Sequence, residues 1–234
     1  MNRLADRLLE HVLSFSLKDV SLPKGVGVLD PFNGENADEV RRIVTRFHHM
    51  YFDDHNERVL MLGINPGRLG AGSTGLSFTD TKRCENDLGI PVHGLRTHEP
   101  SSDFFYRMIR AAGGPGKFYR NVYVHAICPL GFVKQGPQGK DINLNYYDDN
   151  ALEKAVTPFV ENWLGTLVAC GMRTDVVFCI GTGKNAAYFT KLNERLGLFD
   201  RIVALEHPRF VMQYKAKQVD AYVTKYIAAL SEIR

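Results

Sequence analysis

The chain has 234 residues, of which 44% are hydrophobic and 24% charged, a composition typical of globular proteins rather than disordered or fibrous ones. Its formal net charge of +3 permits a polyanionic partner but falls far short of a histone-like balance. The four cysteines are widely spaced without a C-x-x-C pair, which disfavours a disulfide framework or a zinc ribbon and leaves an iron–sulfur cluster open but unsupported. No cleavable signal or apolar span of about 18 residues is present, so we expect a cytoplasmic protein.

Predicted helices alternate with short, continuously apolar strands along the chain. Strands are predicted at residues 59–64, 121–128, 175–180 and 201–205. Helices are predicted at 4–15, 36–51, 101–112, 149–170, 182–196 and 219–230. Residues 18–33 and 131–145 are rich in glycine or proline and are predicted to be loops. This alternation predicts an α/β fold, a three-layer α/β/α sandwich around a mainly parallel four-stranded sheet. We expect one domain over residues 1–234, with residues 1–55 as a helical extension.

The first predicted strand ends in a sequence that indicates a binding site. Pro66 removes a backbone donor and keeps Asn65 out of the helical region, so the strand ends there with an amide at its carboxyl tip. A glycine-rich loop follows and ends near Phe78. Ligands of open parallel sheets bind beyond the carboxyl ends of the strands, and a bare backbone allows their close approach.

The last predicted strand ends in a similar way, at His207 followed by Pro208. Together the two strand ends predict a site with one amide, one imidazole, an aromatic ring and exposed backbone. The motifs contain no obvious Ser-His-Asp set or metal cluster, so we expect neither a metal nor a cofactor. Chemistry at such a site depends on positioning and on stabilising negative charge rather than on a strong nucleophile.

Two nucleotide-binding signatures are incomplete. Gly70-x-Gly72-x-x-Gly75 matches the dinucleotide fingerprint in its letters, but it neither follows the strand directly nor opens a predicted helix. The Gly-Thr-Gly-Lys at residues 181–184 lacks the earlier glycine and the Ser or Thr of a phosphate loop. A nucleotide-dependent α/β enzyme is therefore kept only as an alternative.

Several segments resemble motifs of the single-strand-selective monofunctional uracil-DNA glycosylases. Gly-Ile-Asn-Pro-Gly at 63–67, with Thr-Gly-Leu-x-Phe at 74–78, resembles the first motif of that family. Asn-Asp-Leu-Gly-Ile at 86–90 and Tyr-Val-His-Ala-Ile-Cys-Pro-Leu at 123–130 are similar to later segments, and His-Pro at 207–208 is similar to the start of the last motif. The resemblance covers roughly residues 55 to 230 in matching order and implies hydrolysis of uracil from DNA in base excision repair.

The resemblance also implies roles for individual residues. Asn65 would orient the attacking water, Phe78 would stack on the flipped base, and His207 would bind the base oxygen that gains negative charge. No lysine belongs to these motifs, so the resemblance implies a monofunctional enzyme without a Schiff-base step. We expect a monomer. Residues implied to surround the base are Gly63, Ile64, Pro66, Gly75 and Ala126.

Two departures from the family pattern affect the predicted substrate. The family has an asparagine that reads uracil where this chain has Ala126, whose methyl group neither donates nor accepts a hydrogen bond. We hypothesise that the smaller residue admits larger deaminated bases such as xanthine or hypoxanthine, with Asn143 or Asn145 supplying the amide. After His-Pro the family continues Ser-Pro-Arg-Asn, whereas residues 209–212 here are Arg-Phe-Val-Met.

Basic residues near the strand ends are candidates for contacts with the DNA backbone. A non-catalytic DNA binder that has lost base recognition is the second alternative, and surface charge without a function is the alternative for any single cation. The predicted DNA-binding residues are Arg68, Arg209, Phe210 and Lys215, with Lys82, Arg83 and Lys217 as further candidates.

Overall fold

The computed structural model describes residues 2–17 and 20–233; residues 18 and 19, where a predicted loop begins, lie outside the described part. A four-stranded sheet with the order β3-β2-β6-β7 forms the centre, and every neighbouring pair in it is parallel. Each of the four predicted strands corresponds to one of these. Their bounds are β2 Arg58–Gly63, β3 Val122–Ala126, β6 Met172–Ile180 and β7 Ile202–Leu205.

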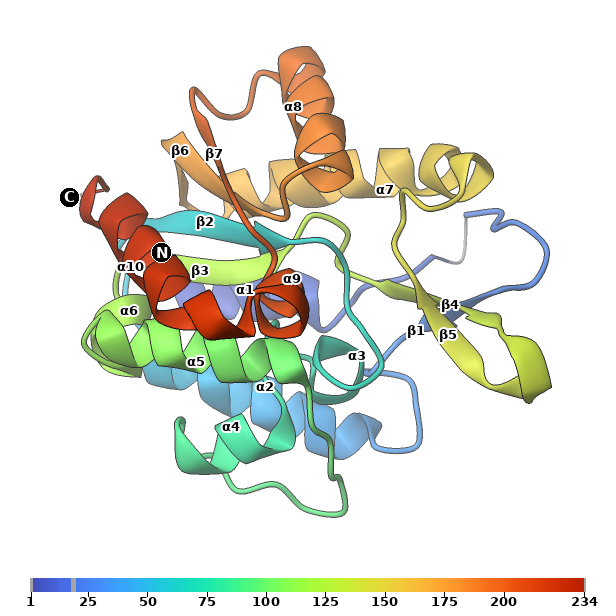
Figure 1. The fold of residues 1–234 in the computed structure, drawn as a ribbon, viewed down its shortest axis with the longest axis horizontal. Coiled ribbons are helices and arrows are strands. Elements are labelled where there is room, and N and C mark those ends of the chain that lie inside the picture. The colour runs from blue at the N-terminus through green and yellow to red at the C-terminus, as the bar shows by residue number, and fades with distance from the viewer. Residues whose placement is uncertain (1, 18–19, 234) are drawn as a thin grey trace.

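Helices cover both faces of this sheet, which confirms the predicted three-layer α/β/α fold. Helices α7 (Asn150–Ala169) and α8 (Lys184–Leu196) lie on one face, and α2 (Ala37–Tyr51) and α5 (Pro100–Ala111) lie on the other (Figure 1). Both layers shield β2 and β3, every residue of which is buried, as expected for continuously apolar strands of a parallel sheet.

Shorter helices connect and flank these layers. Helix α1 (Leu4–Val12) packs on α2. Helices α9 (Pro208–Tyr214) and α10 (Val219–Ser231) pack on α5. None of the helices in the described part of the chain is long and apolar enough to cross a membrane. The remaining helices are α3 Ala71–Thr74, α4 Thr81–Asn86 and α6 Pro115–Tyr119, with short 3-10 turns at Pro137–Gly139 and Ala216–Gln218.

Two segments that were predicted to be loops instead form a second sheet. Strands β1 (Val26–Leu29), β4 (Gly131–Gln135) and β5 (Asp141–Leu144) are antiparallel in the order β1-β4-β5 and project from one side of the molecule (Figure 1). The loop prediction was wrong because the glycines were taken to indicate irregular backbone. Gly131 instead allows close packing within a strand, since a Cβ atom at this position would overlap the carbonyl oxygen of Pro66. The second sheet therefore lies directly against the end of β2.

Candidate active site

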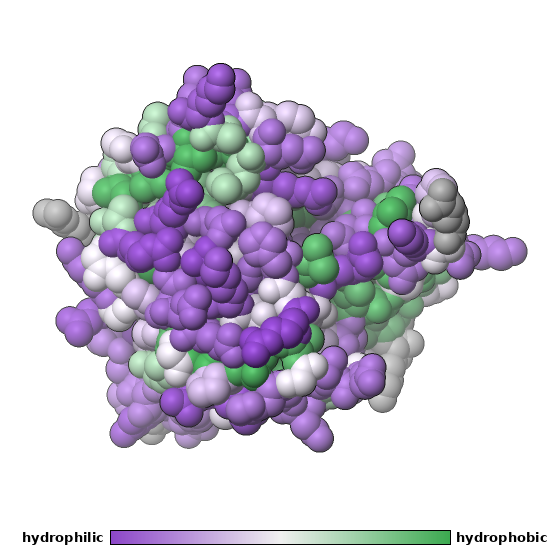
Figure 2. All heavy atoms as spheres, turned by 60° about the horizontal axis from the view of Figure 1, so that its bottom comes forward, coloured by the Kyte–Doolittle hydropathy of each residue, from purple (hydrophilic) through white to green (hydrophobic). Residues whose placement is uncertain are grey.

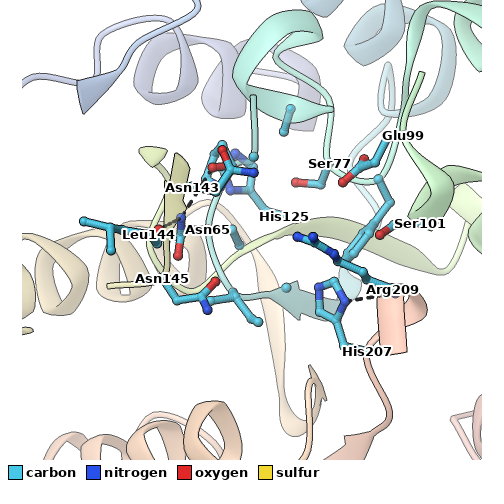
Figure 3. Close-up of a pocket in the computed structure, with 17 residues that line it drawn as sticks. Asn65, Ser77, Glu99, Ser101, His125, Asn143, Leu144, Asn145, His207 and Arg209 are labelled. Carbon is cyan, nitrogen blue, oxygen red and sulfur yellow. Dashed lines mark hydrogen bonds between the residues drawn. The ribbon is translucent and has the colours of Figure 1, made fainter. Parts of the chain in front are cut away.

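A cavity of about 180 Å³ opens at the carboxyl edge of the parallel sheet. Strand β2 pairs with β3 on one side and β6 on the other, so the chain changes direction across the sheet at this point. Such a switch point is where open α/β sheets bind ligands. The cavity brings together Asn65 from the end of β2, Ala126 from the end of β3 and His207 from the end of β7 (Figure 3).

The side chain of Asn65 is fixed by the strand β5 and the residues after it. Its Nδ2 donates to the carbonyl oxygen of Leu144 at 3.1 Å, and its Oδ1 accepts the backbone N–H of Tyr146 at 3.2 Å. These two bonds also decide which end of the amide is oxygen. The two bonds give the amide a fixed orientation. Because its carbonyl oxygen keeps a second lone pair, it can still accept one more hydrogen bond at the cavity.

His207 is the N-cap residue of α9, and this position fixes its tautomer. Its Nδ1 accepts the backbone N–H of Arg209 at 3.1 Å, so in the neutral ring the proton lies on Nε2. Burial, and secondarily the positive charge of Arg209, lower the pKa of His207 to about 4. Near neutral pH the ring is therefore an uncharged hydrogen-bond donor at the cavity wall.

Phe78 lines the cavity with an unusual backbone. Its φ of 53° makes it the single non-glycine residue with positive φ in the described ranges, a conformation that costs on the order of 1–3 kcal/mol. The ring stacks on Phe105 with centroids 4.6 Å apart, and it lies 5.5 Å from the ring of His207. A Cβ atom on Gly63 would come within 2.9 Å of Phe78 Cζ, so the glycine makes room for the ring. Packing thus holds the aromatic ring in the cavity wall against a local backbone strain.

The other residues implied to surround the base lie in two groups. Ile64 and Pro66 line the cavity together with Gly63 and Ala126. The methyl group of Ala126 is buried and its carbonyl oxygen accepts the indole N–H of Trp163 at 3.1 Å, so this end of β3 presents no free polar side chain. Gly75 is placed differently. It lies behind the cavity wall, and its φ of 73° ends α3 ahead of the turn to Phe78.

Both candidate amides from the second sheet line the cavity (Figure 3). The Oδ1 of Asn143 accepts the backbone N–H of Arg68 at 3.2 Å, which leaves its Nδ2 as the available donor. Asn145 follows β5 and sits between Asn65 and His207 in this view. Sequence reasoning considered these two residues, but it placed them on a loop rather than at the end of a strand.

Four polar side chains in the cavity wall were not predicted as site residues: Ser77, Glu99, Ser101 and His125. His125 is buried on β3, its Nδ1 has no hydrogen-bond partner, and burial lowers its pKa to about 3. Glu99 precedes α5, and one of its carboxyl oxygens is also buried without a partner. Of these four, only His125 had a signal in the sequence, because it belongs to the segment at 123–130 that resembles the glycosylase family. Glu99 stands in a polar stretch of the chain and enters the wall through tertiary packing alone.

Most of the predicted DNA-binding residues are accessible around the cavity. Arg68 and Phe210 are exposed, Lys215 is partly exposed at the end of α9, and Arg209 extends across the cavity mouth near Ser101 (Figure 3). Lys82 and Lys217 are exposed as well.

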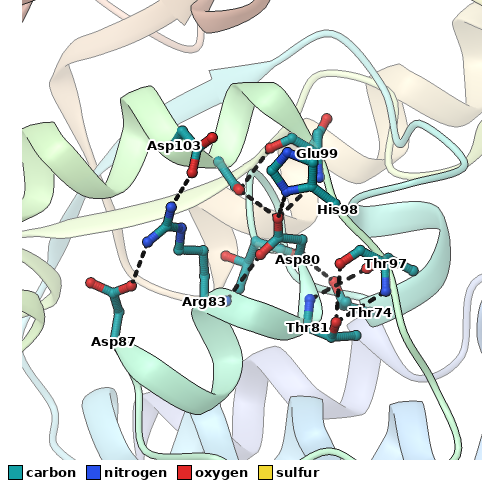
Figure 4. Close-up of polar contacts among 11 residues, drawn as sticks. Thr74, Asp80, Thr81, Arg83, Asp87, Thr97, His98, Glu99 and Asp103 are labelled. Atoms are coloured by element: carbon teal, nitrogen blue, oxygen red, sulfur yellow. Dashed lines mark hydrogen bonds and ion pairs between the residues drawn. The ribbon is translucent and has the colours of Figure 1, made fainter.

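Arg83 was predicted as a further DNA-binding candidate, and its position in the structure contradicts this. It is buried and forms ion pairs with Asp87 and Asp103 (Figure 4), so its charge is neutralised inside the protein.

Several exposed apolar side chains belong to segments that also supply cavity residues. The face of the molecule in Figure 2 is largely hydrophilic with separate apolar areas. Of the large hydrophobic side chains that are exposed, Leu69, Ile142, Phe210 and Tyr214 belong to segments that border the cavity residues. Apolar side chains at such an edge suit contact with exposed bases.

The glycines of the incomplete nucleotide signature have packing roles instead. A Cβ on Gly70 would overlap the carboxyl group of Glu99, and one on Gly72 would come within 2.7 Å of the carbonyl oxygen of Gly67. Three or more His, Cys, Asp or Glu side chains positioned to hold a metal ion are not found together in residues 2–17 and 20–233.

Comparisons with known proteins agree with this geometry. The family model described as the Uracil DNA glycosylase superfamily matches residues 49–231. Proteins from Rattus norvegicus and Mus musculus, both named single-strand selective monofunctional uracil-DNA glycosylase, are 30% identical to this chain over 158 residues. These alignments cover 59% of this chain and 54% of each relative, so the chain spans about half the length of the curated relatives it matches. The crystal structure of wild-type SMUG2 from Pedobacter heparinus has a TM-score of 0.95 and 44% sequence identity, covering 99% of this chain and 98% of that chain.

Proposed function

Since the chain belongs to the uracil DNA glycosylase superfamily and to its single-strand-selective monofunctional branch, we propose that it hydrolyses the N-glycosidic bond of uracil in DNA. We extend the proposal to other deaminated bases such as xanthine and hypoxanthine, and place the reaction at the start of base excision repair. The observation that carries the proposal is the single cavity in which Asn65, Phe78 and His207 meet.

Base release in this cavity begins with the target nucleotide leaving the helical stack, because the reacting bond is inaccessible inside a duplex. The flipped base would lie against the ring of Phe78. The Nε2–H of His207 would then donate to the base oxygen that gains negative charge as the bond breaks. A neutral donor suits this role, since it stabilises the anion without giving up its proton. Donors of this kind contribute on the order of 10² to 10³ in rate.

Asn65 supplies the second part of the mechanism. An amide is too weak a base to deprotonate water, so bond breaking must run ahead of water attack and leave a cationic sugar. The free lone pair on the Asn65 carbonyl oxygen would hold one water in line with that sugar carbon. Its two backbone hydrogen bonds fix the water position before the substrate arrives, which reduces the entropy cost of the step.

The same cavity favours a simple hydrolase over a lyase. Lysine is absent from the cavity lining in the described part of the chain, so no amine is placed to form a Schiff base with the sugar. Ala126 supports the second candidate, a DNA binder without catalysis, because the buried end of β3 presents no group that recognises a base. DNA is the proposed partner in both cases, and we propose that the protein acts as a monomer.

The test is single-turnover base release from an oligonucleotide with one uracil, single-stranded or paired, comparing the parent with Asn65→Ala. The parent should release uracil, and Asn65→Ala should be slower by about 100-fold or more, because the water is no longer oriented. Asn162→Ala on the exposed face of α7 is the matched control and should keep the parent rate. If the parent releases neither uracil, xanthine nor hypoxanthine yet binds DNA in a salt-dependent way, the non-catalytic reading replaces this one.

A further inference from the structure

Glu99 is held in the cavity wall with its carboxyl group unused. Its backbone N–H donates to Asp80 Oδ2 at 3.0 Å, and its carbonyl oxygen accepts the hydroxyl of Ser102 at 2.7 Å. The main chain is therefore pinned at the start of α5. In contrast, the carboxyl Oε2 is buried and has no hydrogen-bond partner, and the side chain does not cap the helix. A buried polar atom without a partner normally costs stability, so Glu99 is not placed here to stabilise the fold.

The surrounding structure reserves space for this carboxyl group. It packs on the backbone of Gly70, where a Cβ atom would overlap it. Ser77 and Ser101 flank Glu99, and Arg209 lies on the mouth side of the cavity (Figure 3). Glu99 is also the single carboxylate side chain in the cavity lining, within the residues that the structure describes.

Burial, modified by two nearby charges, sets the protonation state of Glu99. Burial, and then the negative charge of Asp80, raise its pKa to about 7, while the positive charge of Arg209 acts in the opposite direction. Asp80 faces it from the start of α4 and is itself within 3.3 Å of the His98 ring (Figure 4). The adjacent cation, Arg83, is committed to its two aspartates. A large share of the protein therefore carries a neutral Glu99 near pH 7.

A neutral carboxyl group presents an O–H donor beside a C=O acceptor. Uracil, hypoxanthine and xanthine all carry a ring N–H beside a carbonyl oxygen, so Oε1, the carboxyl oxygen that is not fully buried, can donate to that carbonyl oxygen or accept from that N–H. Four other residues of the wall are less suited. The free lone pair of Asn65 Oδ1 is assigned to the attacking water, and Ala126 offers neither a donor nor an acceptor. His207 and Asn143 each offer a donor alone.

We propose that Glu99 is a specificity-determining residue of this site, whose carboxyl group binds the N–H and C=O edge of the flipped base. The inference rests on the proposed function and adds the group that recognises the deaminated base. The O–H also donates to an oxygen of the departing anion, whereas an ionised carboxylate would repel that anion.

The proposal fixes the direction of a pH effect. The rate of base release should be high where Glu99 is neutral and should fall as the pH rises through about 7. The rate should also fall on the acid side of the pH profile, because His207 becomes charged below about pH 4. In the parent, release should therefore be fastest between these two values. Removing the charge of Arg209, as in Arg209→Gln, should move the alkaline midpoint to higher pH whatever it does to DNA affinity.

The experiment measures single-turnover release of uracil and hypoxanthine between pH 5 and 9 for the parent, Glu99→Gln and Glu99→Ala. Glutamine keeps a donor beside an acceptor and does not ionise, so Glu99→Gln should stay within about threefold of the parent at pH 6 and lose the alkaline fall. Glu99→Ala should be slower by about 10- to 100-fold at pH 6. The control Glu85→Gln removes a partly exposed carboxylate paired with Arg96 and should reproduce the parent profile.

The outcomes separate this inference from the proposed function. If the parent releases uracil and Asn65→Ala does not, the glycosylase reading stands, and the Glu99 variants are then decisive on their own. Parent-like rates and an unchanged pH profile in Glu99→Ala would overturn the role of Glu99, as would a Glu99→Gln as slow as Glu99→Ala. A loss in Asn145→Ala with no loss in Glu99→Ala would assign base recognition to Asn145.

Thermal unfolding at pH 8 excludes a folding defect. Because folding raises the pKa of Glu99 from 4.5 to about 7, the folded state loses stability as the pH rises from about 4.5 to about 7, and the full penalty is present above about pH 7. Both Glu99 variants should therefore unfold at the parent's temperature or above it at pH 8. A clear fall in that temperature would show that Glu99 stabilises the fold and would count against a role in binding.

Discussion

One local hydrogen bond fixes the tautomer of His207, while burial keeps its ring uncharged. A protonated ring would have to carry a proton on Nδ1, where the backbone N–H of Arg209 now donates. The first turn of α9 thus leaves the proton on Nε2 at the cavity wall, while burial and then the charge of Arg209 lower the pKa of His207 to about 4. A half-buried, uncharged donor that is already in place needs no reorganisation when negative charge develops on a base, which is the property that the proposed reaction requires.

Position 126 is the residue at which we expect substrate range to change. Ala126→Asn should raise the preference for uracil over hypoxanthine by about 10-fold, because an amide adds a base-reading group and removes space at a buried end of the cavity. The measurement is the ratio of single-turnover rates on two oligonucleotides that differ in the one base. Ala151→Asn, at the exposed start of α7, should leave the ratio unchanged. An unaltered ratio in Ala126→Asn would show that the base does not approach β3.

At the scale of elements, the second sheet forms part of the candidate active site. Strand β5 ends where Leu144 accepts from Asn65, and β4 passes so close to Pro66 that it needs a glycine at 131. The amide at the tip of β2 is therefore oriented by a neighbouring sheet rather than by its own strand. A substitution in β4 that disturbs this contact should therefore shift Asn65 and lower the rate of base release.

Gly131→Ala tests that coupling. The added Cβ would overlap the carbonyl oxygen of Pro66, so we expect a loss of about 1–3 kcal/mol in the free energy of unfolding. The rate of base release by the remaining folded protein should fall by about 10-fold or more, since the Asn65 loop must shift. Urea unfolding and single-turnover kinetics measure the two effects. Gly165→Ala, inside α7 with free space around it, should be neutral or stabilising and keep the rate. A normal rate in folded Gly131→Ala would separate the two sheets functionally.

The parallel sheet could be predicted from the sequence because each strand of that sheet is an apolar run. The Asn-Pro and His-Pro pairs also marked where two of these strands end. It did not predict β4 and β5, since β5 is mostly exposed and polar and the glycines of this segment are typical of loops. The same limit applies within the site. Asn65, Phe78 and His207 belong to recognisable motifs, whereas Glu99 reaches the cavity through packing on Gly70, for which a sequence has no local signal.

At the scale of the whole molecule, the position of a cation relative to the cavity should matter more for DNA binding than the net charge. The formal net charge is only +3, so attraction to DNA must come from local groups rather than from the total. Arg209 lines the cavity, Arg68 follows the lining residue Gly67, and Lys215 ends the helix that begins at His207. Arg83, by contrast, is neutralised by two aspartates inside the protein. Lys117 belongs to α6, which precedes β3 and so lies at the amino end of the strands, away from the cavity.

This distribution predicts how salt weakens DNA binding. Each phosphate contact that is lost should reduce the slope of log K against log salt by about 0.7 to 0.9. We therefore expect Arg68→Gln and Lys215→Gln each to lower the slope by roughly that amount. Lys117→Gln should leave it unchanged although the net charge falls equally. Fluorescence anisotropy with a uracil-containing oligonucleotide, in the Asn65→Ala background so that the base is retained, measures the slopes. Equal slopes for all three variants would mean that DNA responds to total charge, and that the cations around the cavity do not contact its phosphates.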